Sequence, residues 1–218
     1  MEFFIPAKRI YILLIFFLCA ISIRGQFADD VFDKYTSVGQ LGMTVTNFGI
    51  LGNGWNKING EILPSCQYKQ HTEVLREQVE YFSYAGLWIG GIVNGQRRVS
   101  TAIVDGVFEA GDEGFEFFAT SGIDTASTVS HQDFITDFKD YGETSTDDNG
   151  ITNHNPLGID VHLESYAWSS LPVDAFVLLN YTITNRSENT IENLYAGFWA
   201  DASVANFNYT DYYTPGGG

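Results

Sequence analysis

Apolar and polar residues alternate along much of this chain, and a repeat of two residues is typical of β-strands. The clearest case is the segment 81–103, YFSYAGLWIGGIVNGQRRVSTAI. It predicts a hairpin with its turn at Asn94-Gly95, because a type I′ turn needs positive φ at both central positions. Both faces of the first arm are apolar, so we expect this arm to lie between two layers with Trp88 buried. The second arm should lie nearer an edge.

Further alternating segments predict strands at 43–48, 158–168, 174–184 and 194–204, with the last one forming another antiparallel pair. Residues 67–82 have loosely helical spacing, but the run is short and leads into the hairpin, so we interpret it as strand or extended chain. Residues 121–155 are the most polar part of the chain. We expect them to form a surface excursion pinned back by Phe134, Ile135, Phe138 and Tyr141.

Short strands, frequent glycine and no convincing long helix together favour an all-β fold, specifically an antiparallel β-sandwich with long polar surface loops. We assign this domain to residues 26–204. Residues 205–218 form a tail rich in aromatic residues and glycine. Because crowded aromatic rings need a partner surface, we expect the chain to be part of a longer protein with its last strand or tail unpaired on one side.

Residues 1–25 have the pattern of a secretory signal peptide. Lys8 and Arg9 precede an apolar run at 10–23, which is shorter than a membrane-spanning helix requires. Such a signal would direct export through the inner membrane, to the outside or to the cell surface. We expect cleavage after Gly25, which would leave no membrane span in the mature chain. Two alternatives are a lipoprotein modified at Cys19 and an uncleaved N-terminal anchor.

The chain is strongly acidic, with 11 Lys and Arg against 27 Asp and Glu and a formal net charge of −16. This balance argues against nucleic acid and anionic membrane surfaces as partners, and it fits solubility or calcium binding outside the cell. Without the leader the chain keeps one cysteine, Cys66, so no internal disulfide is expected. We interpret Cys66 as a small buried residue rather than a nucleophile.

Two groups of residues are candidate metal ligands. Asp160, His162 and Glu164 lie at every second position of one predicted strand and therefore share a face. The alternative for them is the solvated face of a half-buried strand. Asp147, Asp148 and Asn149 lie in the polar segment and suggest a calcium loop, although the EF-hand pattern fails because Pro156 stands where its bidentate Glu belongs. Calcium is the one cofactor that the sequence suggests.

The sequence contains no G-x-S-x-G, P-loop, dinucleotide-binding or H-E-x-x-H motif, so we expect no catalytic residues of those classes. The many acidic residues leave open the alternative of a glycosidase with a catalytic pair of carboxylates. Trp55, Trp88, Trp168 and Trp199 suit either a sugar-stacking surface or core packing.

Several short motifs of strand and turn residues occur along the chain: AGLWIGG at 85–91, VST at 99–101, PLGI at 156–159, SYAWSS at 165–170, YTITN at 181–185 and YAGFWAD at 195–201. Together they resemble the N-terminal region of large uncharacterised secreted proteins of Bacteroidetes-type bacteria, which often end in a type IX secretion sorting domain. The resemblance implies a non-enzymatic extracellular structural or adhesive module whose partners are other domains of the same longer polypeptide. The alternative is a secreted carbohydrate-binding module or polysaccharide hydrolase component, with extracellular glycans as partners.

Overall fold

The computed structural model describes residues 33–52, 57–58, 61–73, 77–102, 116–117, 122–141 and 155–203. The predicted signal peptide and the tail at 205–218 lie outside these residues. The described elements are all β-strands in antiparallel sheets, which confirms the predicted all-β fold. None of the described residues belongs to a helix long and apolar enough to cross a membrane.

The larger sheet, sheet 1, contains eight strands. They are β1 (Asp33–Tyr35), β2 (Leu41–Thr46), β3 (Ile50–Leu51), β6 (Cys66–Tyr68), β7 (Val79–Glu80), β8 (Phe82–Val93), β9 (Gln96–Thr101) and β15 (Ile191–Ala202). The order across the sheet is β15-β8-β3-β2-β6-β7, with β1 paired to β2 and β9 paired to β8. A separate small pair is formed by β4 (Lys57–Ile58) and β5 (Glu61–Ile62).

Sheet 2 contains five strands. They are β10 (Glu116–Phe117), β11 (Asp124–Ala126), β12 (Gln132–Asp140), β13 (Ile159–Ala167) and β14 (Val177–Asn185). The order is β10-β12-β13-β14, with β11 also paired to β12. The long strands β12, β13 and β14 run antiparallel in unbroken register over nine residues each.

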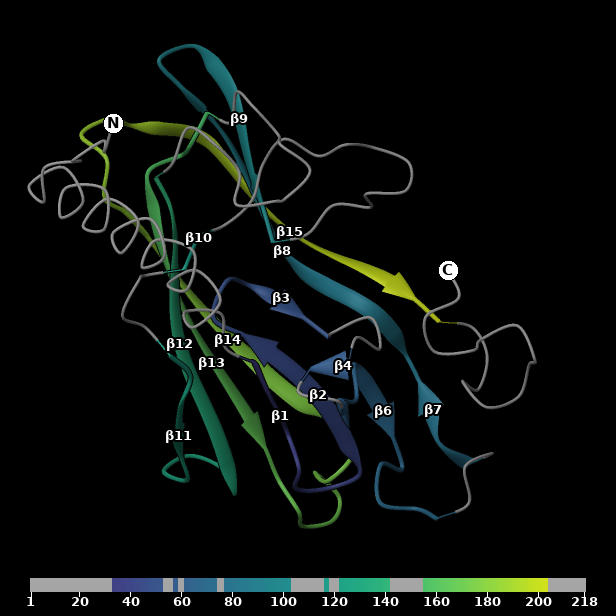
Figure 1. The fold of residues 1–218 in the computed structure, drawn as a ribbon. Coiled ribbons are helices and arrows are strands. Elements are labelled where there is room, and N and C mark those ends of the chain that lie inside the picture. Colours follow the sequence, from purple (N-terminus) through teal and green to yellow (C-terminus); the bar gives the residue numbers. More distant parts are fainter. Residues whose placement is uncertain are drawn as a thin grey trace, which may run out of the picture.

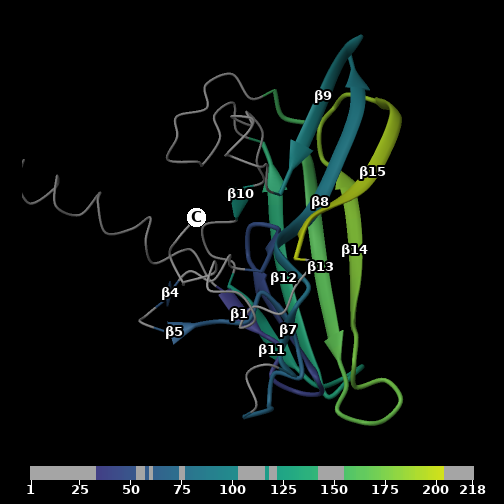
Figure 2. The ribbon, with the colours of Figure 1, turned by 90° about the vertical axis from the view of Figure 1, so that its right-hand side faces the viewer.

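The two sheets pack as layers around one hydrophobic core (Figures 1 and 2). Alternation explains this core, because every second residue of β13 is buried and the residues between them are only half-buried. Sheet 1 contributes Leu41, Met43, Val45, Leu51, Cys66, Ala85, Leu87, Ile89 and Val93. Sheet 2 contributes Phe134, Phe138, Ile159, Val161 and Leu163.

The predicted hairpin is confirmed. Asn94 and Gly95 both have positive φ, 52° and 77°, as a type I′ turn requires. Strand β8 is interior to its sheet, since β15 pairs along one edge while β3 and β9 pair along the other. Strand β9 pairs with β8 alone among the described strands, as expected for an edge position.

The expected burial of Trp88 between layers is wrong. Ala85, Leu87, Ile89 and Val93 are buried on the core side of β8, but Trp88 on the opposite face is only half-buried. Its ring stacks on Trp199 of β15, with ring centroids 6.4 Å apart and an interplanar angle of 9°. No described layer covers that face, so the apolar character of both faces reflects a cross-strand aromatic pair rather than a second covering layer.

This geometry changes the expected cost of removing the ring. Trp88→Ala should lower the free energy of unfolding by about 1–3 kcal/mol, less than the ~3–5 kcal/mol typical of a fully buried ring. Urea denaturation of residues 26–218 would measure it. Trp199→Ala should have a similar effect, and the double variant should cost less than the sum because the two rings share one contact. Strict additivity would show that the stack contributes nothing.

Two further expectations are corrected. Residues 132–140 are not part of a surface excursion: they form β12, which lies inside sheet 2 and buries Phe134 and Phe138. The last strand, β15, does not pair with the strand before it but crosses to sheet 1 and pairs with β8. Local alternation sets which residues face inward, but it carries no information on which strand pairs with which.

Cys66 is a buried free thiol, as expected. Its backbone amide donates to a side-chain oxygen of Glu80, which is itself buried. Burial, and then the charge of Glu80, raise the pKa of the Cys66 thiol to about 12. The thiol therefore stays protonated at neutral pH, which argues against a nucleophilic role.

Candidate functional site

The outward side chains of β12, β13 and β14 form a largely polar surface, called the polar face below. Its position follows from alternation, because the residues between the buried positions of β13 point away from the core. The members are Asp133, Ile135, Asp137, Lys139, Asp160, His162, Glu164, Tyr166, Leu178, Asn180, Thr182 and Thr184.

Strand register arranges these side chains in rows across the sheet. His162 lies directly between Asp137 on β12 and Thr182 on β14. The next row places Asp160 between Lys139 and Thr184. Directly opposed residues of neighbouring strands lie close enough to interact, so each row brings donors and acceptors together.

His162 is held between two carboxylates. Its Nδ1 lies 2.8 Å from Oδ1 of Asp137, and its Nε2 lies 3.8 Å from Oε1 of Glu164. Glu164 also accepts a hydrogen bond of 2.8 Å from Nδ2 of Asn180 on β14. Hydrogen bonds from Asn180 and then Tyr166 hold the pKa of Glu164 below its ordinary value, so this carboxylate is charged at neutral pH.

Asp160 organises the other end of the polar face. Arg186, just after β14, donates from Nε to Oδ2 of Asp160 over 2.7 Å. The hydroxyl of Tyr141, just after β12, donates to the other oxygen of Asp160. Burial and the hydrogen bond to Asp160 raise the pKa of Tyr141 to about 12, so the phenol keeps the proton that it donates.

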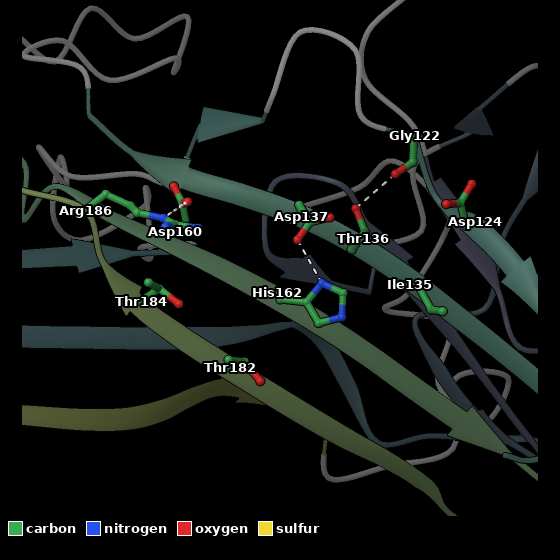
Figure 3. A pocket seen from close by; sticks show the side chains of 10 residues that line it. All are labelled: Gly122, Asp124, Ile135, Thr136, Asp137, Asp160, His162, Thr182, Thr184 and Arg186. Atoms are coloured by element: carbon green, nitrogen blue, oxygen red, sulfur yellow. Dashed lines mark hydrogen bonds and ion pairs between the residues drawn. The ribbon is translucent and has the colours of Figure 1, made fainter.

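An open depression of about 510 Å³ lies over this surface (Figure 3). Figure 3 shows the Arg186–Asp160 and His162–Asp137 pairs side by side along its floor, with Thr182 and Thr184 beside them. Asp124 and Gly122, on and before β11, line it on the opposite side. The depression therefore offers carboxylate acceptors, a guanidinium donor and hydroxyls within one surface.

Aromatic rings continue the polar face beyond Tyr166. The Tyr166 and Trp168 rings lie 6.4 Å apart, and the Trp168 and Phe176 rings lie 5.6 Å apart, both pairs tilted by 50°. Phe176 is 43% exposed. Of the four tryptophans considered for sugar stacking, Trp168 thus lies next to the polar face. Trp88 and Trp199 lie on sheet 1, and Trp55 lies outside the described residues.

Asp160, His162 and Glu164 share one face of a strand, as the sequence predicts. They do not converge on one point, because Asp160 binds Arg186 whereas Glu164 binds Asn180. Within the described ranges, no group of three or more His, Cys, Asp or Glu side chains is arranged to hold a metal ion. The second candidate, Asp147, Asp148 and Asn149, lies outside the described residues, so the calcium loop stays a prediction.

Acid–base catalysis gains no support from His162. A histidine that activates a nucleophile needs one ring nitrogen on the nucleophile and the other on an orienting group. Both nitrogens of His162 face carboxylates instead.

Sequence reasoning missed Asp137, Arg186, Asn180 and Tyr141 as members of this surface. Asp137 had a detectable signal, since Asp133, Ile135, Asp137 and Lys139 alternate with inward residues of β12. The sequence carries no such signal for Arg186 and Tyr141. Each follows the end of its strand and reaches Asp160 only because the strands pair in the folded protein.

Comparisons of the chain with protein-family models, with curated proteins and with solved structures gave no match in any of the three.

Proposed function

We propose that this chain is a non-enzymatic extracellular adhesive module of a secreted or cell-surface bacterial protein, and that it binds glycans through the polar face. The observation that carries this proposal is that the hydrogen-bonding depression and the aromatic rings of Tyr166, Trp168 and Phe176 lie along the same face of sheet 2, with the row of Glu164 and Asn180 between them. Sugars present hydroxyls at their edges and C–H groups on their faces. A surface that joins paired carboxylates and a guanidinium to aromatic rings matches both.

The extracellular part of the proposal rests on the leader pattern at residues 1–25 and on the acidic composition. Export by type IX secretion, and a place among further domains of a longer polypeptide, rest on the motif resemblance alone. The opposing alternative, a hydrolase component, would need a catalytic carboxylate pair in addition to a binding surface.

A glycan array probed with residues 26–218, followed by calorimetric titration of the retained glycans, tests the binding role. Phe176→Ala removes an exposed ring and should weaken binding about ten-fold, corresponding to ~1.4 kcal/mol. Asp160→Asn should weaken it as well, because Arg186 then loses the charge that orients it. The matched control is Tyr195→Ala, which removes a ring that is 74% exposed on β15 of the other sheet.

Binding unchanged in Phe176→Ala and Asp160→Asn, or no retained glycan at all, would refute the proposal. Release of reducing sugar from a retained polysaccharide would favour the hydrolase alternative. Repeating the titration with EDTA and with added calcium tests the calcium site predicted at residues 147–149. A calcium requirement abolished in Asp147→Asn would support that predicted site.

A further inference from the structure

The sandwich is open along one side. Among the described strands, β14 is the last strand of sheet 2 and β15 is the last strand of sheet 1. The two strands meet at the loop 186–190 and then separate (Figure 1). A groove of about 380 Å³ lies where they diverge, and its apolar lining comes from Ile159 and Ile183 on sheet 2 and from Ile191 and Leu194 on β15.

No layer formed by the described residues covers the inner face of β15. Phe198 is directly opposite Leu87, and Ala196 is directly opposite Ile89. Opposed residues point to the same side of a sheet, so Phe198 shares the core-facing side with two buried residues of β8. Phe198 is nevertheless 53% exposed. Sheet 2 therefore ends before it reaches this part of β15.

The inner face of β14 is also only partly covered. Val177, Leu179, Tyr181 and Ile183 pack against the core but are only partly buried. The hydroxyl of Tyr181 is buried without a hydrogen-bond partner among the described residues. One more strand beside β14 would lie under β15 and would complete both faces.

The edge of β14 is suited to accept such a strand. Its nine residues, VLLNYTITN, include no charged residue and no proline, and they pair with β13 without any irregularity. Native edge strands usually avoid pairing through charges, proline or bulges. Strand β15 has such protection, since its register with β8 shifts at two places, whereas β14 has none.

The net charge of the chain distinguishes between a second copy of the chain and a different partner at the edge of β14. Two copies of a chain with net charge −16 would repel each other as whole molecules, although the edge itself carries no charged residue. We infer that the free edge of β14 binds a β-strand supplied by another domain, with an apolar side chain at every second position and no acidic residues. This strand extends sheet 2 beneath β15 and covers Phe198. The inference goes beyond glycan binding, because it concerns the backbone edge of β14 and the inner face of β15, and because the partner is a polypeptide.

The test uses residues 26–218 and a synthetic peptide as long as β14, with Val, Ile or Phe alternating with Thr and a lysine at each end. Fluorescence anisotropy measures binding, and hydrogen exchange locates it. We expect the peptide to bind and to slow amide exchange in β14, while β12 exchanges as before. The same peptide with a central proline should not bind, because proline removes a backbone donor and does not fit an interior strand.

Two variants of one strand give a matched comparison. Phe198→Lys places a positive charge over the proposed strand and should weaken binding at least ten-fold. Tyr195→Lys, on the opposite face of β15 and more exposed, should leave it unchanged. Neither residue is buried, so both variants should fold, and their circular dichroism verifies this.

Three outcomes would overturn the inference. The first is no binding, or equal binding of the proline peptide. The second is a dimer by light scattering whose formation protects β14, since the occupant would then be a second copy. The third is protection of β14 in the monomer that is lost on deleting residues 204–218, since this segment would then be the occupant. Glycan binding can fail or succeed independently of all three.

Discussion

Phe138→Ala should lower the free energy of unfolding by about 3–5 kcal/mol, the usual cost of removing a buried aromatic ring. Phe138 is fully buried on β12, directly opposite Val161 of β13, and belongs to the core shared by both sheets. A domain of this size is stable by only ~5–15 kcal/mol, and Cys66, the one cysteine among the described residues, is a free thiol that adds no cross-link. Urea denaturation of residues 26–218, monitored by tryptophan fluorescence, measures the change.

Phe176→Ala is the control for this measurement. Phe176 is the same residue type, but it is exposed and contacts Trp168 at the surface. Its removal should cost about 1 kcal/mol, the value of a surface aromatic pair. Equal effects of the two substitutions would mean that residues 132–140 lie on the surface and that β12 is not an interior strand.

Asp133→Asn should have the second largest effect, about 2–3 kcal/mol at neutral pH. The buried carboxylate of Asp133 accepts hydrogen bonds from the backbone amides of Thr128 (2.7 Å), Val129 (2.9 Å) and Ser130 (2.8 Å). The hydroxyls of Thr128 and Ser130 donate to it as well. Asparagine offers one acceptor oxygen in place of two and directs an N–H group at these donors, so the loop between β11 and β12 loses its anchor.

The pH dependence of stability gives this prediction a second readout. Burial alone would raise the pKa of Asp133, but the hydrogen bonds from Ser130, Val129 and Thr128 outweigh it and hold the pKa well below its ordinary value of 3.8. The folded protein therefore binds this proton less readily than the unfolded protein does. The stabilisation is complete at neutral pH and is lost progressively as the pH falls below about 4.

The wild-type protein should therefore lose stability on acidification faster than Asp133→Asn does. Asp137→Asn is the matched control, because Asp137 lies on the same strand and face but its side chain is 52% exposed. It should change the unfolding free energy by less than 1 kcal/mol. Parallel pH profiles for wild type and Asp133→Asn would contradict the role assigned to Asp133.

Alternation predicted the strands well where one face is buried and the other is polar. β13 and β14 appear almost where the sequence indicates them, and their alternating apolar residues lie on the inner side. The turn at Asn94-Gly95 is equally local, since it depends on two residues that tolerate positive φ. The prediction failed for residues 132–140, whose high polarity suggested a loop. Polar residues fit an interior strand there because a carboxylate such as Asp133 is satisfied by the neighbouring loop.

The candidate site was predictable only in part. Asp160, His162 and Glu164 share a face because of strand geometry, which the sequence contains. Their partners Asp137, Asn180 and Arg186 come from other strands and a loop, and these partners turn a suspected ligand cluster into a network of ion pairs and hydrogen bonds.

By itself, the sequence determined the all-β class, the main hairpin and the inward and outward faces of the long strands, because these depend on backbone preferences and on a period of two. The tertiary structure decided which strands are neighbours. In it, β15 pairs with β8 in sheet 1, and β14 lies at the edge of sheet 2 among the described strands. Backbone hydrogen bonds are nearly the same for any pair of strands, so pairing is selected by packing of the whole core, which no local segment encodes.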